Sequence, residues 1–363
     1  MCSVQTGHTQ NPFAFLESCS ALGRQQLRLY SALRDAVPII DAAIMKLVRL
    51  TGGFCIRCTD SAAQETLDRF FDSVNVNGNS LGLESFVSSY FEQLLTYGTA
   101  IGEIVTDSTG FPVALFNAPL ENIELKRNAN GIDIDVFTVC SGTPQKVRYP
   151  ELVIMSALNP KPGELCGNSL LSGLPFVAQT LMQIFRTTGT NWERLGNTRF
   201  AVTYKPANDA LDKAYAKERA MQVAKEWSSA MSSESVRDFV AVGDIQIKAI
   251  GSETQIPDSE IPVRQLLEQI VSKTGLPPFL LGLSWSSTER MSSQQADALT
   301  SELEAYRRIL TPAITRLANT CLRLFGLSGG TQVIWDDIML QDMVELSRAE
   351  LYSAQALRLT KEE

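Results

Sequence analysis

The stretch IVSKTGLPPFLLG, residues Ile270–Gly282, decides how the rest of the chain is interpreted. It closes the segment Ile261–Thr274, whose apolar residues recur three and four apart, the spacing of one face of an α-helix. Gly275 ends that pattern. Pro277 and Pro278 prevent the helix from continuing, because proline lacks a backbone donor and restricts the residue before it. The stretch therefore predicts a helix that stops at a sharp turn.

On its C-terminal side a polar segment, Ser284–Ser292, precedes a long helix over Ser293–Leu324. Ser292 and Gln295 form a capping-box pattern at the head of that helix, and Pro312 predicts a kink within it. A strand over Gln332–Trp335 and a final helix beginning near Gln341 complete the expected elements.

On its N-terminal side, an insert with β-α-β order separates two helices. The first helix is expected over Leu174–Leu195, and the second is the Ile261–Thr274 segment. The elements expected inside the insert are Phe200–Tyr204, Ala210–Met231, Asp238–Val242 and Ile245–Ile250.

The first part of the chain mixes helices and short strands, which gives an α+β fold class. Amphipathic helices are expected over Val37–Leu50 and Leu81–Tyr97, with strands at Phe54–Cys58 and Thr99–Val105. Further short strands, separated by turn signals, predict a small antiparallel sheet; they are Phe111–Phe116, Ile123–Lys126, Ile132–Val139 and Lys146–Tyr149. The run Leu152–Met155 closes this part of the chain.

The bulk composition excludes several classes of protein. The 363 residues carry a net charge of −8, so the chain does not resemble a protein that grips DNA phosphates tightly, although DNA could still pass along an acidic wall. The seven cysteines are scattered and odd in number, which fits a reducing cytoplasm better than a disulfide framework. No apolar run approaches the roughly 20 residues that span a bilayer, so no membrane association is expected.

The sequence lacks the residues that most kinds of enzyme catalysis require. The single histidine, His8, lies in a polar N-terminal arm, which argues against Ser-His-Asp, Cys-His and histidine-based metal sites. No GxxxxGK[ST] loop occurs, so no ATP hydrolysis is expected. Gly167-Asn-Ser169 resembles part of a nucleophile elbow but lacks the second glycine, and a structural role at a helix start is the preferred interpretation. We expect no catalytic residue, no cofactor and no metal.

Two features leave a metal-dependent enzyme as the alternative. Cys55-Ile-Arg-Cys58 has CxxC spacing, but it falls within a predicted strand and has no second ligand pair. The acidic pairs Asp336-Asp337 and Glu302/Glu304 are ordinary for solvated surface and give no ligand geometry.

The opening stretch and two motifs that follow it carry a resemblance. Ile270–Gly282 resembles a family pattern of a helix, a GLPP or GVPP break, and LLG. Met291–Gln295 and Leu310-Thr-Pro312 resemble the polar loop and the L-x-P of the next long helix in that same pattern.

Two motifs upstream of the opening stretch complete this resemblance. Asn159-Pro160 followed by Gly167–Leu171 resembles the pattern's NP…GxSLL entry to a helix, and Leu95–Gly98 followed by Ala100–Ile104 resembles its L-x-x-G-x-A step from helix to strand. In order and spacing, from about Leu81 to the C-terminus, these motifs resemble the portal protein family of tailed bacteriophages, the siphovirus-like head–tail connector portals.

This resemblance implies a domain plan. The expected parts are a wing over 1–168, a first stem helix over 169–197, a clip over 198–257, a second stem helix over 258–283, a tunnel loop over 284–292, and a long helix with the C-terminal wing over 293–363. The chain ends shortly after the expected last wing helix, so the helical crown of many portals is expected to be small or absent.

The resemblance also implies a function without a catalytic step. Portal subunits form a ring, a dodecamer, at one capsid vertex and in the virion; assembly takes place in the host cytoplasm. Their ring passes double-stranded DNA during packaging and ejection. The expected partners are the terminase motor, a head–tail adaptor, the major capsid and scaffold proteins, and DNA without sequence specificity. A channel-less structural capsid or adaptor protein is a further alternative.

Two sets of site residues follow from the resemblance. The DNA-facing tunnel loop would comprise Ser284, Trp285, Ser286, Ser287, Thr288, Glu289, Arg290 and Met291. Trp285 could stack on DNA and Arg290 could contact phosphate transiently, or both could belong to an ordinary surface loop. The clip residues expected to dock a partner protein are Lys213, Lys217, Arg219 and Lys225, although the helix that carries them also fits an ordinary exposed helix.

Overall fold

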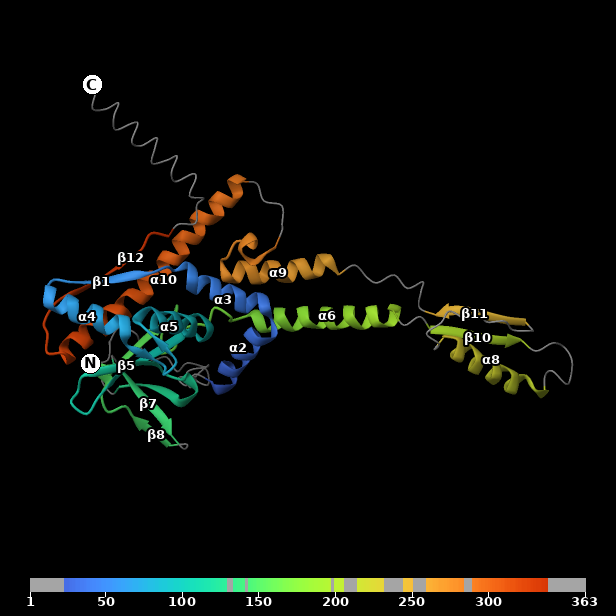
Figure 1. Ribbon diagram of the computed structural model, residues 1–363, viewed down its shortest axis with the longest axis horizontal. Helices are drawn as coiled ribbons and strands as arrows, with labels where there is room; N and C mark the ends of the chain where they lie inside the picture. The colour runs from blue at the N-terminus through green and yellow to red at the C-terminus, as the bar shows by residue number, and fades with distance from the viewer. Residues whose placement is uncertain are drawn as a thin grey trace, which may run out of the picture. The chain divides into compact units, whose positions relative to one another are not determined.

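A computed structural model describes residues 23–128, 133–140, 143–196, 199–205, 214–231, 244–250, 259–283 and 289–338. The chain forms two compact units. Unit 1 comprises Met1–Ala178 together with Leu266–Glu363, and unit 2 comprises Gln179–Gln265 between them. Helices and strands occur together in both units (Figure 1), which confirms the expected α+β fold class.

Helix α5, Leu83–Tyr97, packs on a five-stranded sheet at the centre of unit 1. The strand order is β3-β2-β5-β4-β9, and only the β2–β5 pair is parallel. The strands are β2 (Asn75–Val76), β3 (Ser80–Leu81), β4 (Thr99–Thr106), β5 (Pro112–Asn117) and β9 (Val153–Ala157). One face of α5 is buried, including Tyr90, Phe91, Leu94 and Leu95, because the helix presents these residues to the sheet at helical spacing.

The predicted single antiparallel sheet is wrong, because its strands divide between two sheets. The 3-10 turn Leu120–Asn122, which follows Pro119, turns the chain out of the central sheet. Three strands then form their own antiparallel sheet; they are β6 (Ile123–Arg127), β7 (Ile134–Cys140) and β8 (Thr143–Lys146). The two sheets share an apolar cluster that includes Ile101, Leu125 and Val136, so burial holds them together without hydrogen bonds between them.

The expected strand Lys146–Tyr149 begins three residues earlier, as β8. Pro150 starts the 3-10 turn Pro150–Leu152, and proline cannot donate to a strand ladder, so the strand does not reach Tyr149.

Two helices of unit 1 were not predicted from the sequence. Helix α2 spans Arg24–Ala36, and helix α4 spans Ser61–Ser73. The side chain of Asp60 accepts a hydrogen bond from Ala63 N at 3.0 Å and so caps α4. The predicted Val37–Leu50 helix is confirmed as α3, Pro38–Leu50.

The C-terminal part of unit 1 returns to its N-terminal part. Helix α10, Glu289–Leu324, buries a stripe that includes Leu299, Leu303, Leu310 and Leu317. It contacts α4 and β9. After it, β12 (Thr331–Trp335) pairs antiparallel with β1 (Phe54–Cys58), so the predicted strands at both positions are confirmed. The final helix expected near Gln341 lies outside the described residues.

Unit 2 has the expected β-α-β order. Helix α6, Leu174–Gly196, leads into it from unit 1, and helix α9, Glu260–Thr274, leads back. Strands β10 (Arg199–Lys205) and β11 (Asp244–Ile250) pair antiparallel, and helix α8 (Ala216–Met231) contacts β10. The expected strand Asp238–Val242 lies outside the described residues. Among the residues that are described, no helix is both long and apolar enough to cross a membrane.

Candidate functional site

The expected tunnel loop is described only at its end. Residues 284–288 lie outside the described part of the chain, and Glu289, Arg290 and Met291 form the first turn of α10. The structure therefore gives the two points from which this connection is held, the turn after α9 and the body of α10. Of the residues expected to dock a partner protein, Lys213 lies outside the described residues, whereas Lys217, Arg219 and Lys225 are exposed on α8.

The segment after α9 is firmly attached to unit 1. Leu276 and Pro277 are buried, and the 3-10 turn η3, Pro278–Leu281, contacts α3. Gly282 ends this turn with φ of 76°, a conformation that a residue with a side chain rarely adopts. Leu283 N then donates to Pro278 O at 3.0 Å. The break predicted at the proline pair is thus an ordered turn that fixes where the connection leaves unit 1.

Helix α10 is fixed by a buried arginine. The guanidinium of Arg307 donates from Nε and Nη2 to the carbonyl oxygen of Thr51 at 2.8 and 2.6 Å. It also lies over the Trp335 ring, 5.1 Å from the centroid. Trp335 Nε1 donates to Thr311 Oγ1 at 2.9 Å. One side chain therefore ties α10 both to the end of α3 and to β12.

Burial lowers the pKa of Arg307, and the carboxylates of Asp336, Glu304 and Asp337 oppose that shift. Arginine remains protonated in proteins, so the group stays a cation. A charge in this position is tolerated because Nε and Nη2 donate to Thr51 O and acidic groups lie nearby.

A close contact between backbones joins the central sheet to the entry of α6. Gly98, with φ of 79°, ends α5, and its carbonyl accepts from Leu158 N at 2.7 Å. Leu158 O in turn accepts from Asn168 N at 2.7 Å. A Cβ on Gly167 would lie 2.0 Å from Gly98 O, so only glycine fits there. The structure thus brings together two of the sequence motifs, Leu95–Gly98 and Gly167–Leu171.

Ser169 has a structural role in this junction. It is 6% exposed, and its hydroxyl donates to Thr96 O at 2.6 Å and accepts from Leu171 N at 2.9 Å. Its only proton is thus engaged, and the turn that precedes α6 depends on these bonds. The role at a helix start that the sequence favoured over a nucleophile is confirmed.

A charged group supports the same junction from the other side. Arg34 Nη1 donates to Glu92 at 2.7 Å and to Thr96 Oγ1 at 3.0 Å, and Arg34 Nη2 donates to Asp41 at 2.6 Å. Burial alone would lower the pKa of Arg34, but the hydrogen bonds to Asp41 and Glu92 raise it above its ordinary value. Arg34 therefore links α2, α3 and α5, and through Thr96 it reaches Ser169.

The described residues show no arrangement for metal or redox chemistry. They contain no group of three or more His, Cys, Asp or Glu residues that could hold a metal ion. Cys55 and Cys58 lie in β1 with no disulfide, and because they are three apart in a strand they point to opposite faces. Burial, followed by the nearby Asp68 and Asp60, raises the pKa of Cys58, which disfavours the reactive thiolate.

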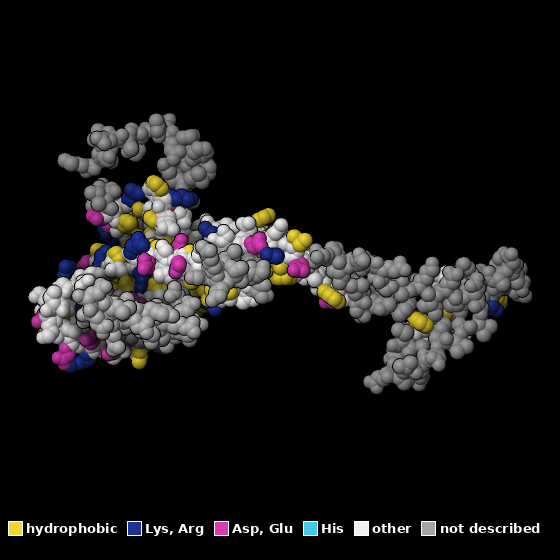
Figure 2. Space-filling view, turned by 90° about the horizontal axis from the view of Figure 1, so that it is seen from above, with side chains coloured by type: hydrophobic (Ala, Val, Ile, Leu, Met, Phe, Trp, Pro, Cys, Tyr) yellow, Lys and Arg dark blue, Asp and Glu magenta, His cyan; other side chains and the backbone are white. Residues whose placement is uncertain are grey.

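The described residues on the face seen in Figure 2 show no large field of one sign. On the face seen in Figure 2, Lys and Arg side chains lie interspersed with Asp and Glu side chains over the described residues. Such a surface does not resemble a groove that grips nucleic acid through its phosphates.

Comparison with known proteins points to one group of structures. No protein-family model and no curated protein sequence matches the chain. A chain in the neck of the native gene transfer agent (GTA) particle, computed with C12 symmetry, aligns with TM-score 0.64 and 16% identity over 89% of this chain and 88% of its own length. A chain in the neck of the empty GTA particle, computed with C6 symmetry, aligns with TM-score 0.65 and 15% identity over 89% and 88%.

An HK97 family phage portal protein from Corynebacterium diphtheriae aligns more weakly, with TM-score 0.46 and 12% identity over 84% of this chain and 94% of that one. The two neck chains therefore show the fold: this chain shares it along nearly its whole length, and along nearly the whole of theirs.

Proposed function

We propose that the chain is one subunit of a ring-shaped portal that passes double-stranded DNA into and out of a tailed phage or phage-derived particle. The observation that carries this proposal is the fold shared with chains of the GTA neck over 89% of this chain. The ordered motifs of the sequence, from Leu95–Gly98 to Leu310-Thr-Pro312, support it independently because they resemble the portal family.

The neighbours also support a ring. Their neck structures were computed with C12 and C6 symmetry. Contacts between two different surfaces of identical subunits close into such cyclic assemblies when the rotation between neighbours is right. For this chain we propose a homo-oligomeric ring, a dodecamer, located at one vertex of the capsid.

The stem helices and the connection between α9 and α10 have a place in this proposal. Helices α6 and α9 form the stem beside the channel, and residues 284–291 face the DNA. The buried pair Leu276 and Pro277, with the turn Pro278–Leu281 that contacts α3, holds that connection at one end, and the Arg307 contacts of α10 hold it at the other. The net charge of −8 favours sliding, since an acidic wall does not retain DNA phosphates.

The exposed helix α8 is proposed as the docking surface for the terminase motor and later for the head–tail adaptor. Lys217, Arg219 and Lys225 are exposed there. Basic side chains on such a surface would raise the rate of encounter with an acidic partner.

Electron microscopy of the purified chain tests the proposal. Closed rings with a central hole of roughly 20 Å or more, wide enough for a duplex, are expected. Monomers that stay unassembled even when co-expressed with capsid and scaffold proteins would overturn it. A ring without a hole would favour a channel-less structural protein, and metal-dependent turnover by the purified chain would favour the enzyme alternative.

A further inference from the structure

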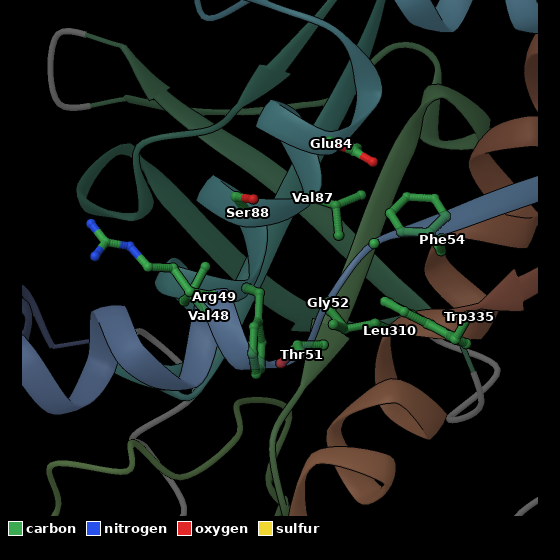
Figure 3. A pocket seen from close by; sticks show the side chains of 12 residues that line it. Val48, Arg49, Thr51, Gly52, Phe54, Glu84, Val87, Ser88, Leu310 and Trp335 are labelled. Carbon is green, nitrogen blue, oxygen red and sulfur yellow. The ribbon is translucent and has the colours of Figure 1, made fainter. Parts of the chain in front are cut away.

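An acid-lined apolar groove runs along one side of unit 1. A cavity of about 190 Å3 lies between the end of α3, the start of α5 and β12 (Figure 3). A second cavity of about 380 Å3 adjoins it beside α4. The two cavities share Phe54 and Glu84, so they form one groove.

The groove presents apolar surface to solvent. Leu81, at its outer end, is 63% exposed, and Phe54, Val87 and Trp335 line its inner end. Large apolar side chains exposed beside a concave surface are typical of a site that another protein covers.

The charges around the groove are acidic. Asp68, Asp72 and Glu84 line its outer part, whereas at its inner end Asp336 lies against Gly53 and the Arg307 guanidinium lies against Gly52 and Trp335, so the unbalanced acidic charge belongs to the outer part. Arg49 also borders it, but Figure 3 shows that side chain pointing away from the cavity. Within the described residues, neither Asp72 nor Glu84 makes a salt bridge. An occupant of this groove should therefore combine apolar and basic side chains.

The opposite side of unit 1 carries such a segment. After β8, the edge strand of the three-stranded sheet, the chain presents Arg148 and Tyr149. Tyr149 is 50% exposed, and the Arg148 guanidinium lies 5.3 Å from the centroid of its ring. In the described part of the chain, Arg148 has no salt-bridge partner, whereas Lys146 beside it pairs with Asp135.

The two surfaces lie on opposite sides of unit 1. Figure 1 shows β1 and β12, whose residues Phe54 and Trp335 line the groove, on one side of α5, and β7 and β8 on the other. Complementary surfaces on opposite sides of one subunit produce a head-to-tail contact, and such contacts generate a closed ring when the rotation between subunits closes.

We propose that the occupant of the groove is a second copy of this chain. The second copy inserts its Tyr149 into the groove of the first and places its Arg148 against Asp72 and Glu84 of the first. This inference rests on the proposed ring and names the surfaces that join its subunits. The aromatic ring fills the apolar part of the groove, and the guanidinium pairs with carboxylates that have no other salt-bridge partner among the described residues.

Charge reversal tests the contact. Asp72→Lys should weaken subunit association about tenfold or more, because like charges then face each other. Asp72 is exposed in the last turn of α4, where an acidic side chain opposes the helix dipole, so the change should not unfold the subunit. Arg148→Glu should weaken association likewise. The double variant Asp72→Lys/Arg148→Glu should restore rings.

A matched control is Asp35→Lys. Asp35 is also an exposed acid in the last turn of a helix, α2, but it does not line the groove. The control should assemble like the wild-type chain. The fraction of chain in rings, measured by mass photometry over a range of concentrations, is the readout, and circular dichroism confirms folding of each variant.

The outcomes separate this contact from the proposed function. If the wild-type chain forms no rings even when it is co-expressed with capsid and scaffold proteins, both fail. If wild-type, Asp72→Lys and Arg148→Glu chains form rings equally, the contact is wrong and the ring stands. If the variants form normal rings but the resulting particles lack a tail, the groove binds another virion protein, and the contact is again wrong.

A density map of the wild-type ring gives an independent check. Asp72 of one subunit and Arg148 of the next should lie in direct contact. A separation beyond about 10 Å, the screening length at ordinary ionic strength, would overturn the proposal.

Discussion

At the scale of single residues, Arg307 shows how one side chain can hold a long helix in place. Its two hydrogen bonds to Thr51 O satisfy a carbonyl at the end of α3, and its guanidinium lies over Trp335. Nothing in the sequence marks this residue, since an arginine within a helix usually lies at the surface. The contact to Thr51 spans 256 positions of sequence, and no local pattern could have revealed it.

Arg307→Met should therefore destabilise unit 1 by about 2 kcal/mol, because it leaves a buried carbonyl without its donor. Arg307→Lys should recover only part of that loss, since a lysine cannot supply the forked pair of donors. Arg308→Met is the matched control, because Arg308 is the exposed neighbour in the same helix. Urea unfolding followed by tryptophan fluorescence measures the change. Equal losses for Arg307→Met and Arg308→Met would contradict the assigned role.

At the scale of elements, the junction before α6 depends on the approach of two backbone segments. Gly98 and Gly167 meet there, and Leu158 donates to Gly98 O and accepts from Asn168 N. The chain can pass from the central sheet into α6 along this path only because neither residue carries a side chain. The helix is thereby attached to unit 1 at its first residues.

Gly167→Ala should disrupt this junction. The added methyl would lie 2.0 Å from Gly98 O and 2.3 Å from Leu158 N, and backbone atoms cannot move aside as a flexible side chain can. We expect the free energy of unfolding to fall by about 3 kcal/mol or more. The Leu158 amide, which bonds to Gly98 O, should lose its protection from hydrogen exchange.

Gly189→Ala gives a control of opposite sign. Gly189 lies within α6, and a methyl there would meet nothing within 4 Å. This variant should gain up to about 1 kcal/mol, because alanine favours a helix interior. A Gly167→Ala chain as stable as the wild type would show that the junction can move.

The same scale shows what the sequence could predict. Helices α6, α9 and α10 have long apolar stripes, and their bounds are confirmed to within a few residues. Helix α4 was not predicted, although Asp60 before it is a recognisable cap. The division into two sheets was not predicted, because strand pairing is set by burial between distant segments such as Ile101 and Val136.

For the candidate site, motif order located the α9–α10 connection and both halves of the junction. Their meeting could not be predicted, since Gly98 and Gly167 are far apart in sequence. Residues 284–288, which hold most of the expected DNA-facing set, lie outside the described residues, so their role stays a prediction.

At the scale of the whole molecule, the proposed ring makes DNA retention depend on the connection between α9 and α10. Both flanks of that connection are fixed to unit 1, by the turn Pro278–Leu281 and by Arg307. Residues between two fixed points can change without disturbing the subunit around them. The loop can therefore be tested separately from assembly.

Trp285→Ala and Arg290→Ala should leave rings intact and reduce the DNA that particles retain. Trp285 would lose a stacking surface for bases or sugars, and Arg290 would lose a phosphate contact, each a weak interaction repeated in every subunit of the ring. Arg69→Ala is the control, because Arg69 is exposed on α4 and pairs only with Glu65 in the part of the chain described. Quantification of DNA per purified particle, together with microscopy of the rings, gives the readout.

If both loop variants retain as much DNA as the control, the connection does not contact DNA, although the ring itself would stand. If the rings themselves fail, the loop instead belongs to the contact between subunits.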